Sequence, residues 1–174
     1  MTKRTFVKMI ANAKRDLLRE LVGVLRKKKA TFCIIGGLAV NAYAEPVVSL
    51  DLDLVVSAKK VNNLLPLFSK KYKVKRFSNS INITASYSDL RIQIQTDQRY
   101  QEFIKRAKIK NILGYKLPVA CIEDVLKGKI WAFQDEQRRP SKRQKDLADI
   151  MRLLEADHKL SVLIPDDIKR KLAL

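Results

Sequence analysis

The sequence predicts an α+β protein: a mixed β-sheet flanked by helices, followed by a helical C-terminal third. In the first part of the chain, short apolar runs bounded by turn residues alternate with segments of helical spacing. From about residue 121 onward, helical spacing dominates. We therefore expect a core over residues 1–120 that includes an N-terminal helix, and a helical segment over residues 121–174 packed on it.

Helices are expected wherever apolar residues recur at a period near 3.6. Lys and Arg fill the other face of the helix expected over residues 5–28, and Pro66 is an obstacle inside the helix expected over residues 58–69. A polar loop is expected over residues 134–141. The expected helices cover residues 5–28, 38–44, 58–69, 98–108, 122–133, 142–156 and 165–174.

Strands are expected where apolar and polar residues alternate between turn signals, or where a short run is fully apolar. For residues 109–119 two alternatives stay open, a strand pair or an irregular link around Gly114. The expected strands cover residues 31–35, 50–56, 72–77, 81–87 and 90–95.

Charge is the extreme property of the composition. The chain carries 36 Lys and Arg against 18 Asp and Glu, a net charge of +18, and its isoelectric point is about 10.1. This excess indicates an anionic partner, with nucleic acid as the first candidate. The alternative is a basic surface that only keeps the protein soluble, but the excess is larger than solubility requires.

Other residue types narrow the class of protein. Cys33 and Cys121 lie in apolar surroundings, which is typical of core residues in a reducing compartment. One histidine and no paired cysteine motif argue against a zinc site. Apolar runs are too short for a membrane span, so we expect a cytoplasmic protein with no membrane partner.

Two carboxylates, Asp51 and Asp53, stand two residues apart on the strand expected over residues 50–56. Side chains at i and i+2 of a strand project from the same face, so the two carboxylates lie together. The two carboxylates repel each other unless a cation lies between them. The simplest interpretation of the carboxylate pair is a site for a hard divalent ion that prefers oxygen ligands, such as Mg²⁺ or Mn²⁺. The alternative is an acidic pair on a surface strand.

Gly36 and Gly37 end the preceding apolar run and open the short helix expected after it. Glycine lets the backbone approach a ligand closely, and free N–H groups at a helix start favour phosphate. Taken alone, a glycine pair is also compatible with a plain loop.

Together these residues support a family resemblance. Ile35-Gly36-Gly37 followed by Asp51-Leu52-Asp53 resembles the nucleotidyltransferase fold shared with polymerase-beta-like enzymes. The segments 36–40, 46–54, 122–129 and 145–150 are similar to the AbiEii-type nucleotidyltransferases, known chiefly as toxins of toxin–antitoxin systems. The resemblance runs from about residue 31 to residue 154.

The resemblance implies a role for each matched residue. Asp51 and Asp53 would bind the metal and act in catalysis, and Gly36, Gly37 and Ser49 would contact nucleotide phosphates. Lys129 would approach the phosphates as a point charge, and Asp146 would position the substrate or the lysine. For Lys129 and Asp146 the alternative is a pair of ordinary solvated helix residues.

Two positions depart from the family pattern. Val47 stands where the family often has an arginine, and Gln93 stands where a third carboxylate is expected. The amide oxygen of Gln93 can coordinate a metal, but a neutral amide cannot act as a base.

Three hypotheses follow from this pattern. The first is a Mg²⁺-dependent nucleotidyltransferase that moves a nucleotide from a nucleoside triphosphate to an acceptor hydroxyl of RNA, especially tRNA. Such an enzyme would be the toxin of a toxin–antitoxin pair, with an acidic antitoxin as partner. The second is a catalytically impaired protein of the same fold that binds nucleotide or RNA without chemistry. The third is a component that acts only through a protein partner, such as an acidic antitoxin.

Overall fold

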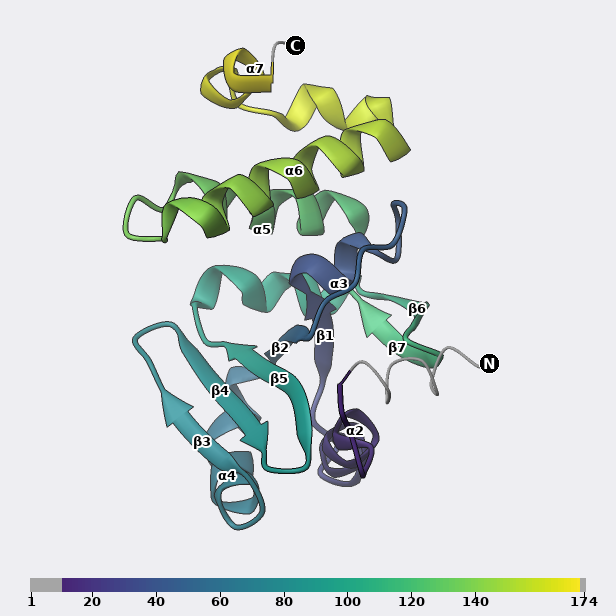
Figure 1. Cartoon of the computed structure of the whole chain (residues 1–174), viewed down its shortest axis with the longest axis vertical. Coiled ribbons are helices and arrows are strands. Elements are labelled where there is room, and N and C mark those ends of the chain that lie inside the picture. Colours follow the sequence, from purple (N-terminus) through teal and green to yellow (C-terminus); the bar gives the residue numbers. More distant parts are fainter. Residues whose placement is uncertain (1–10, 173–174) are drawn as a thin grey trace.

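A seven-stranded mixed sheet forms the centre of the molecule in the computed structural model, which describes residues 11–172 (Figure 1). The strand order is β3-β4-β5-β2-β1-β7-β6. The strands are β1 (Phe32–Ile35), β2 (Asp51–Val56), β3 (Lys73–Arg76), β4 (Ser80–Ala85), β5 (Ser88–Gln95), β6 (Lys108–Ile112) and β7 (Tyr115–Val119).

Parallel and antiparallel pairs are mixed in this sheet. β2 is parallel to β5 and antiparallel to β1, while β1 is parallel to β7. The β3–β4, β4–β5 and β6–β7 pairs are antiparallel. These pairings confirm the α+β prediction of a mixed sheet with flanking helices.

Two groups of helices flank the sheet. Figure 1 shows α2 and α4 at one end of the molecule and α5, α6 and α7 at the other, with α3 beside β1. The α-helices are α2 (Leu17–Lys27), α3 (Gly36–Val40), α4 (Ala58–Ser69), α5 (Ile122–Gln134), α6 (Pro140–Ala156) and α7 (Asp166–Leu172), and the 3₁₀ helices are η1 (Gln98–Arg106) and η2 (His158–Leu163).

The first helix is shorter than the prediction. Residues 11–16 form turns and bends, and α2 begins at Leu17, while residues 5–10 of the predicted helix lie outside the described residues. Asp16 marks the start because its side chain accepts a hydrogen bond from the Arg19 backbone N–H at 3.0 Å. A positive φ of 49° at Asn12 also breaks helical geometry before that point.

Two further helices differ in bounds or type, and one of the two alternatives for residues 109–119, the strand pair, is confirmed. The short helix predicted over residues 38–44 begins two residues earlier, at Gly36, and ends at Val40. The segment predicted as a helix over residues 98–108 is the 3₁₀ helix η1, and β6 begins at Lys108. Residues 108–119 form a hairpin, because Leu113 and Gly114 both have positive φ and close a two-residue turn.

The two faces of β2 differ in polarity, and this difference positions the site. Leu52 and Leu54 are buried, and so are their β5 neighbours Ile92 and Ile94. Asp51 and Asp53 project from the other face and are only half-buried. Burial of the leucines therefore fixes which way the aspartates point.

Candidate active site

Gly36 leads the chain from β1 into α3 directly beside Asp53. Its φ is +68°, a left-handed conformation that favours glycine. A Cβ at Gly36 would overlap Oδ2 of Asp53 and lie 2.9 Å from the Asp53 Cβ. The Gly36 backbone therefore forms one wall against this carboxylate, and a side chain there would displace it.

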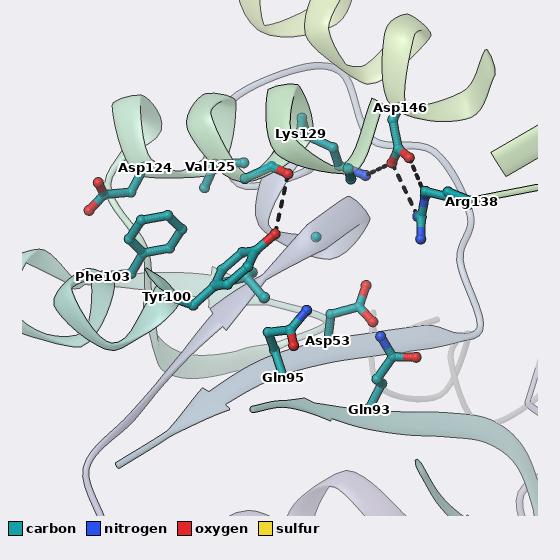
Figure 2. Close-up of a pocket in the computed structure, with 14 residues that line it drawn as sticks. Asp53, Gln93, Gln95, Tyr100, Phe103, Asp124, Val125, Lys129, Arg138 and Asp146 are labelled. Carbon is teal, nitrogen blue, oxygen red and sulfur yellow. Dashed lines mark hydrogen bonds and ion pairs between the residues drawn. The ribbon is translucent and has the colours of Figure 1, made fainter. Parts of the chain in front are cut away.

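Gln93 lies opposite Asp53 on the neighbouring strand. The register pairs Asp53 of β2 with Gln93 of β5, and Gln93 in turn with Asn82 of β4. Figure 2 shows the Gln93 amide beside the Asp53 carboxylate. The position next to Asp53 on this face of the sheet is thus held by a neutral amide.

A buried ion network on helices α5 and α6 faces the aspartates. Lys129 of α5 contacts Asp146 and Asp149 of α6, with Nζ–Oδ distances of 2.9 and 2.7 Å. All three residues are buried, with 7%, 1% and 3% of their surface exposed. Arg138, from the loop between the helices, donates to Asp146 through Nε at 2.6 Å (Figure 2).

Two carboxylates set the charge state of Lys129. Burial alone would lower the pKa of its amine, but the negative charges of Asp146 and Asp149 outweigh this effect and raise the pKa. Lys129 is therefore positively charged at neutral pH, contacts α6 and lines the same cavity as Asp53.

Cations surround Asp51. Arg91 Nη2 lies 2.7 Å from Asp51 Oδ1, and Lys142 Nζ lies 3.5 Å from Oδ2. The side chain of Arg91 is 62% exposed, so its contact is weak and easily exchanged. Ser49 accepts a hydrogen bond from the Asp51 backbone N–H through Oγ at 3.2 Å and places its hydroxyl at the same end of β2.

Within residues 11–172, Asp53 forms no ion pair. Burial raises the pKa of its carboxyl, the charge of Asp51 raises it further, and Lys129 offsets part of the effect. Two adjacent carboxylates and the Gln93 amide oxygen match the oxygen donors that Mg²⁺ takes when substrate phosphates complete its coordination. Residues 11–172 contain no cluster of three or more His, Cys, Asp or Glu that could hold a metal alone.

Two cavities meet at this point. The larger, about 220 Å³, is polar and lined by Asp51, Ser49, Arg91, Lys142 and Lys145. The smaller, about 80 Å³, extends toward Tyr100 and Phe103 (Figure 2). The residues shared by both are Asp53, Gln93, Lys129, Arg138 and Asp146.

The structure thus gathers the site residues named in the sequence around one cavity system: Gly36, Gly37, Ser49, Asp51, Asp53, Gln93, Lys129 and Asp146. Sequence reasoning missed Asp149, although it lies three residues after Asp146 and so on the same helix face. Arg91, Arg138 and Lys142 were not among the residues assigned to the site either. Val47, the other departure, lies in the loop before β2 and is 52% exposed.

Comparison with known proteins relies on structure alone, since no protein-family model and no curated protein sequence matches the chain. The antibiotic-resistance factor ANT(2'')-Ia superposes with a TM-score of 0.62 at 15% identity, covering 90% of this chain and 92% of that one. The lincosamide antibiotic adenylyltransferase LnuA gives 0.54 at 13% identity, covering 82% and 99%.

A nucleotidyltransferase-like protein from Paracoccidioides brasiliensis gives a TM-score of 0.51 at 19% identity, covering 88% of this chain and 75% of that one. The chain has the nucleotidyltransferase fold. In this nucleotidyltransferase fold the aspartate pair stands on β2, which follows the glycine turn after β1, helix α3 and the loop over residues 41–50. The described helices include none long and apolar enough to cross a membrane.

Proposed function

We propose that the protein is a Mg²⁺-dependent nucleotidyltransferase that moves a nucleotide from a nucleoside triphosphate to an acceptor hydroxyl. The observation that carries the proposal is the pair Asp51 and Asp53, on one face of β2, against the glycine turn and below a set of cations. Such a set suits a reactant that carries both a metal ion and several phosphate charges.

In this proposal each residue has a defined task. Asp51, Asp53 and the Gln93 amide oxygen hold Mg²⁺ or Mn²⁺, which neutralises triphosphate charge when bound. The backbone at Gly36 and Gly37 and the Ser49 hydroxyl contact phosphate oxygens. Asp146 positions Lys129 and Arg138, which its carboxylate contacts directly.

The reaction is a substitution at the α-phosphorus. A bond forms between the acceptor oxygen and this phosphorus, the bond to the bridging oxygen breaks, and pyrophosphate leaves. The acceptor hydroxyl releases its proton to water. Lys129 keeps its positive charge beside the Asp53 carboxylate throughout, since its pKa is raised.

RNA, especially tRNA, is the acceptor that we propose. The net charge of +18 supports a polyanionic acceptor more than a small molecule. The test is incubation with each labelled triphosphate, Mg²⁺ and total tRNA, with lincomycin and tobramycin as small-molecule control acceptors. Label on tRNA that disappears in Asp51→Ala supports this assignment, and label on the small acceptors alone contradicts it.

We further propose the role of toxin in a toxin–antitoxin pair, with an acidic protein as antitoxin. The sequence resemblance and the strongly basic surface support this role. Induced expression in bacteria should stop growth, and Asp51→Ala should restore it. Growth arrest by both proteins alike would contradict a role through catalysis.

A second candidate is a protein of this fold that binds nucleotide or RNA without chemistry. Gln93 beside Asp53 favours it, because an amide supplies neither a third negative charge nor a base. No label transfer, together with salt-dependent RNA binding, supports this candidate. A large gain of activity in Gln93→Asp would show that a third carboxylate had been missing.

A further inference from the structure

The open face of strands β3, β4 and β5 carries a row of polar and cationic side chains that leads to the aspartate pair. The register pairs Lys75 of β3 with Asn82, Asn82 with Gln93, and Gln93 with Asp53. Residues directly opposite each other on neighbouring strands project from the same face. A straight row of side chains therefore crosses the sheet from its β3 edge to Asp53.

A second, parallel row strengthens the pattern. Lys73 pairs with Thr84, two residues along the same strands and therefore on the same face. We call Lys73, Lys75, Asn82, Thr84 and Gln93 the sheet strip.

The opposite face of these strands is packed against the core. Ile83, which alternates with these residues, belongs to the hydrophobic core, Val74 is partly buried against it, and Figure 1 shows α4 behind β3 and β4. Both lysines of the sheet strip are exposed. Neither forms an ion pair with another residue of the described part of the chain.

We propose that the sheet strip binds the single-stranded 3′ end of an acceptor RNA and guides its terminal hydroxyl to Asp53. This inference rests on the proposed function, and it names the path that the acceptor follows. Three strand spacings separate the β3 lysines from β2, roughly 14 Å, a distance that a few nucleotides of a single strand can span. Lys73 and Lys75 would contact phosphates upstream of the reacting end.

Asn82 gives the reason to choose RNA. Its Oδ1 atom is buried and accepts no hydrogen bond from residues 11–172. Asn82 also lines the 220 Å³ cavity together with Asp53 and Gln93. Phosphate oxygens cannot donate a hydrogen bond to this atom, whereas a ribose 2′-hydroxyl can, and DNA lacks that group.

Another explanation for the lysines is protection of an edge strand, since lysine on an edge strand discourages pairing with other molecules. That explanation predicts no effect on RNA affinity. The test must therefore measure binding, and it must keep the edge polar, so glutamine is the replacement for lysine.

The experiment measures binding of a short, end-labelled single-stranded RNA by fluorescence anisotropy over a range of salt, without triphosphate or metal. The test variant is Lys73→Gln/Lys75→Gln. The control is Lys27→Gln/Lys28→Gln, which removes the same charge from exposed residues at the end of α2. Thermal unfolding verifies that both variants fold.

The proposal predicts that the test variant binds roughly tenfold more weakly at ~0.1 M salt and loses about 1.4 from the log–log salt slope. The control should keep most of both. Equal loss in the two variants, or no loss in either, overturns the proposal. Because no nucleotide is present, these outcomes are independent of whether label transfer occurs.

Asn82→Ala provides the second readout. Wild-type protein should prefer RNA over DNA of the same sequence, and the variant should lose a few-fold of that preference while it keeps DNA affinity. An unchanged RNA-to-DNA ratio would remove Asn82 from the path. Equal wild-type affinity for RNA and DNA would overturn the assignment to RNA.

Discussion

Gly36 leaves no space for a side chain beside Asp53: a Cβ there would lie 2.9 Å from both Cβ and Cγ of the aspartate. The φ of Gly36 is also +68°, which L side chains rarely adopt. One backbone position therefore fixes how a central carboxylate of the site is oriented.

Gly36→Ala should damage the site more than the fold. The left-handed backbone costs about 1–2 kcal/mol of unfolding free energy, and displacement of Asp53 should slow nucleotide transfer about a hundredfold. Urea unfolding and label transfer measure the two effects. Gly23→Ala in α2 is the control, because a Cβ there meets nothing within 4 Å, so it should keep activity and gain stability. Wild-type transfer in Gly36→Ala would contradict this view of Asp53.

Lys129→Met should be destabilising. It removes the cation shared by Asp146 and Asp149, and although each carboxylate keeps one arginine contact, with Arg138 and Arg152, loss of the buried lysine should cost about 1–3 kcal/mol of unfolding free energy. Because the folded-state pKa of Lys129 is raised, its stabilisation is complete below the unfolded pKa of about 10.4 and is lost only as pH rises through the folded value. The measurement is urea unfolding at neutral pH.

The matched control is Lys127→Met, an exposed lysine on the same helix, for which a change within about 0.5 kcal/mol is expected. Adding Asp149→Asn to Lys129→Met should recover part of the loss, because it removes one of the two buried carboxylates that have lost their contact with the lysine. If the double variant is less stable than the single one, buried charge is not the cause.

Asp53→Asn should stabilise the folded protein at neutral pH. The folded-state pKa of Asp53 is raised, chiefly by burial, so ionisation opposes folding at every pH above the unfolded pKa. The advantage of the variant should shrink as pH falls toward about 3.9, where the carboxyl is neutral in both states. Thermal unfolding from pH 4 to pH 8 measures this advantage. A stability difference between variant and wild type that stays constant across this range would contradict a raised pKa of Asp53.

Arg91→Gln should tighten metal binding in the absence of nucleotide. The guanidinium lies 2.7 Å from Asp51 Oδ1 and competes with a divalent ion for that oxygen. We expect a few-fold gain in Mn²⁺ affinity, because exposed ion pairs contribute about 0.2–1 kcal/mol. Isothermal titration with Mn²⁺ measures it.

The same variant should bind triphosphate more weakly. In the wild-type protein we expect the Arg91 guanidinium, once a metal ion has displaced it from Asp51, to contact a phosphate, and glutamine cannot supply that charge. Arg99→Gln is the control, because its guanidinium pairs with Asp97 instead of Asp51. Mn²⁺ affinity that falls in Arg91→Gln would show that the arginine supports the metal site.

Local patterns predicted most of the fold. α4 was predicted over the same residues, 58–69, and α5 differs by one residue at its end, because apolar spacing and flanking turn residues are short-range signals. The start of α2 was wrong, since residues 11–16 depend on the Asp16 cap and on backbone conformation at Asn12. The division at residue 120 stays a prediction.

Most of the long-range ion pairs could not be predicted from the sequence. Lys129 and Asp146 were named, and spacing puts Asp149 on the same helix face as Asp146, but its contact with Lys129 depends on how α5 packs on α6. The contact of Lys142 with Asp51 joins residues 91 positions apart. Spacing along one element cannot predict such contacts, because they depend on how elements pack.

Label transfer in wild-type protein and in Asp51→Ala tests the central claim most directly. The protein, Mg²⁺ and each α-labelled triphosphate are incubated with total tRNA, and the RNA is separated and counted. We expect one or more triphosphates to label RNA with wild type, and no label with Asp51→Ala or without divalent metal. Equal labelling by Asp51→Ala, or none by folded wild-type protein with any triphosphate, would contradict nucleotidyl transfer at the aspartate pair.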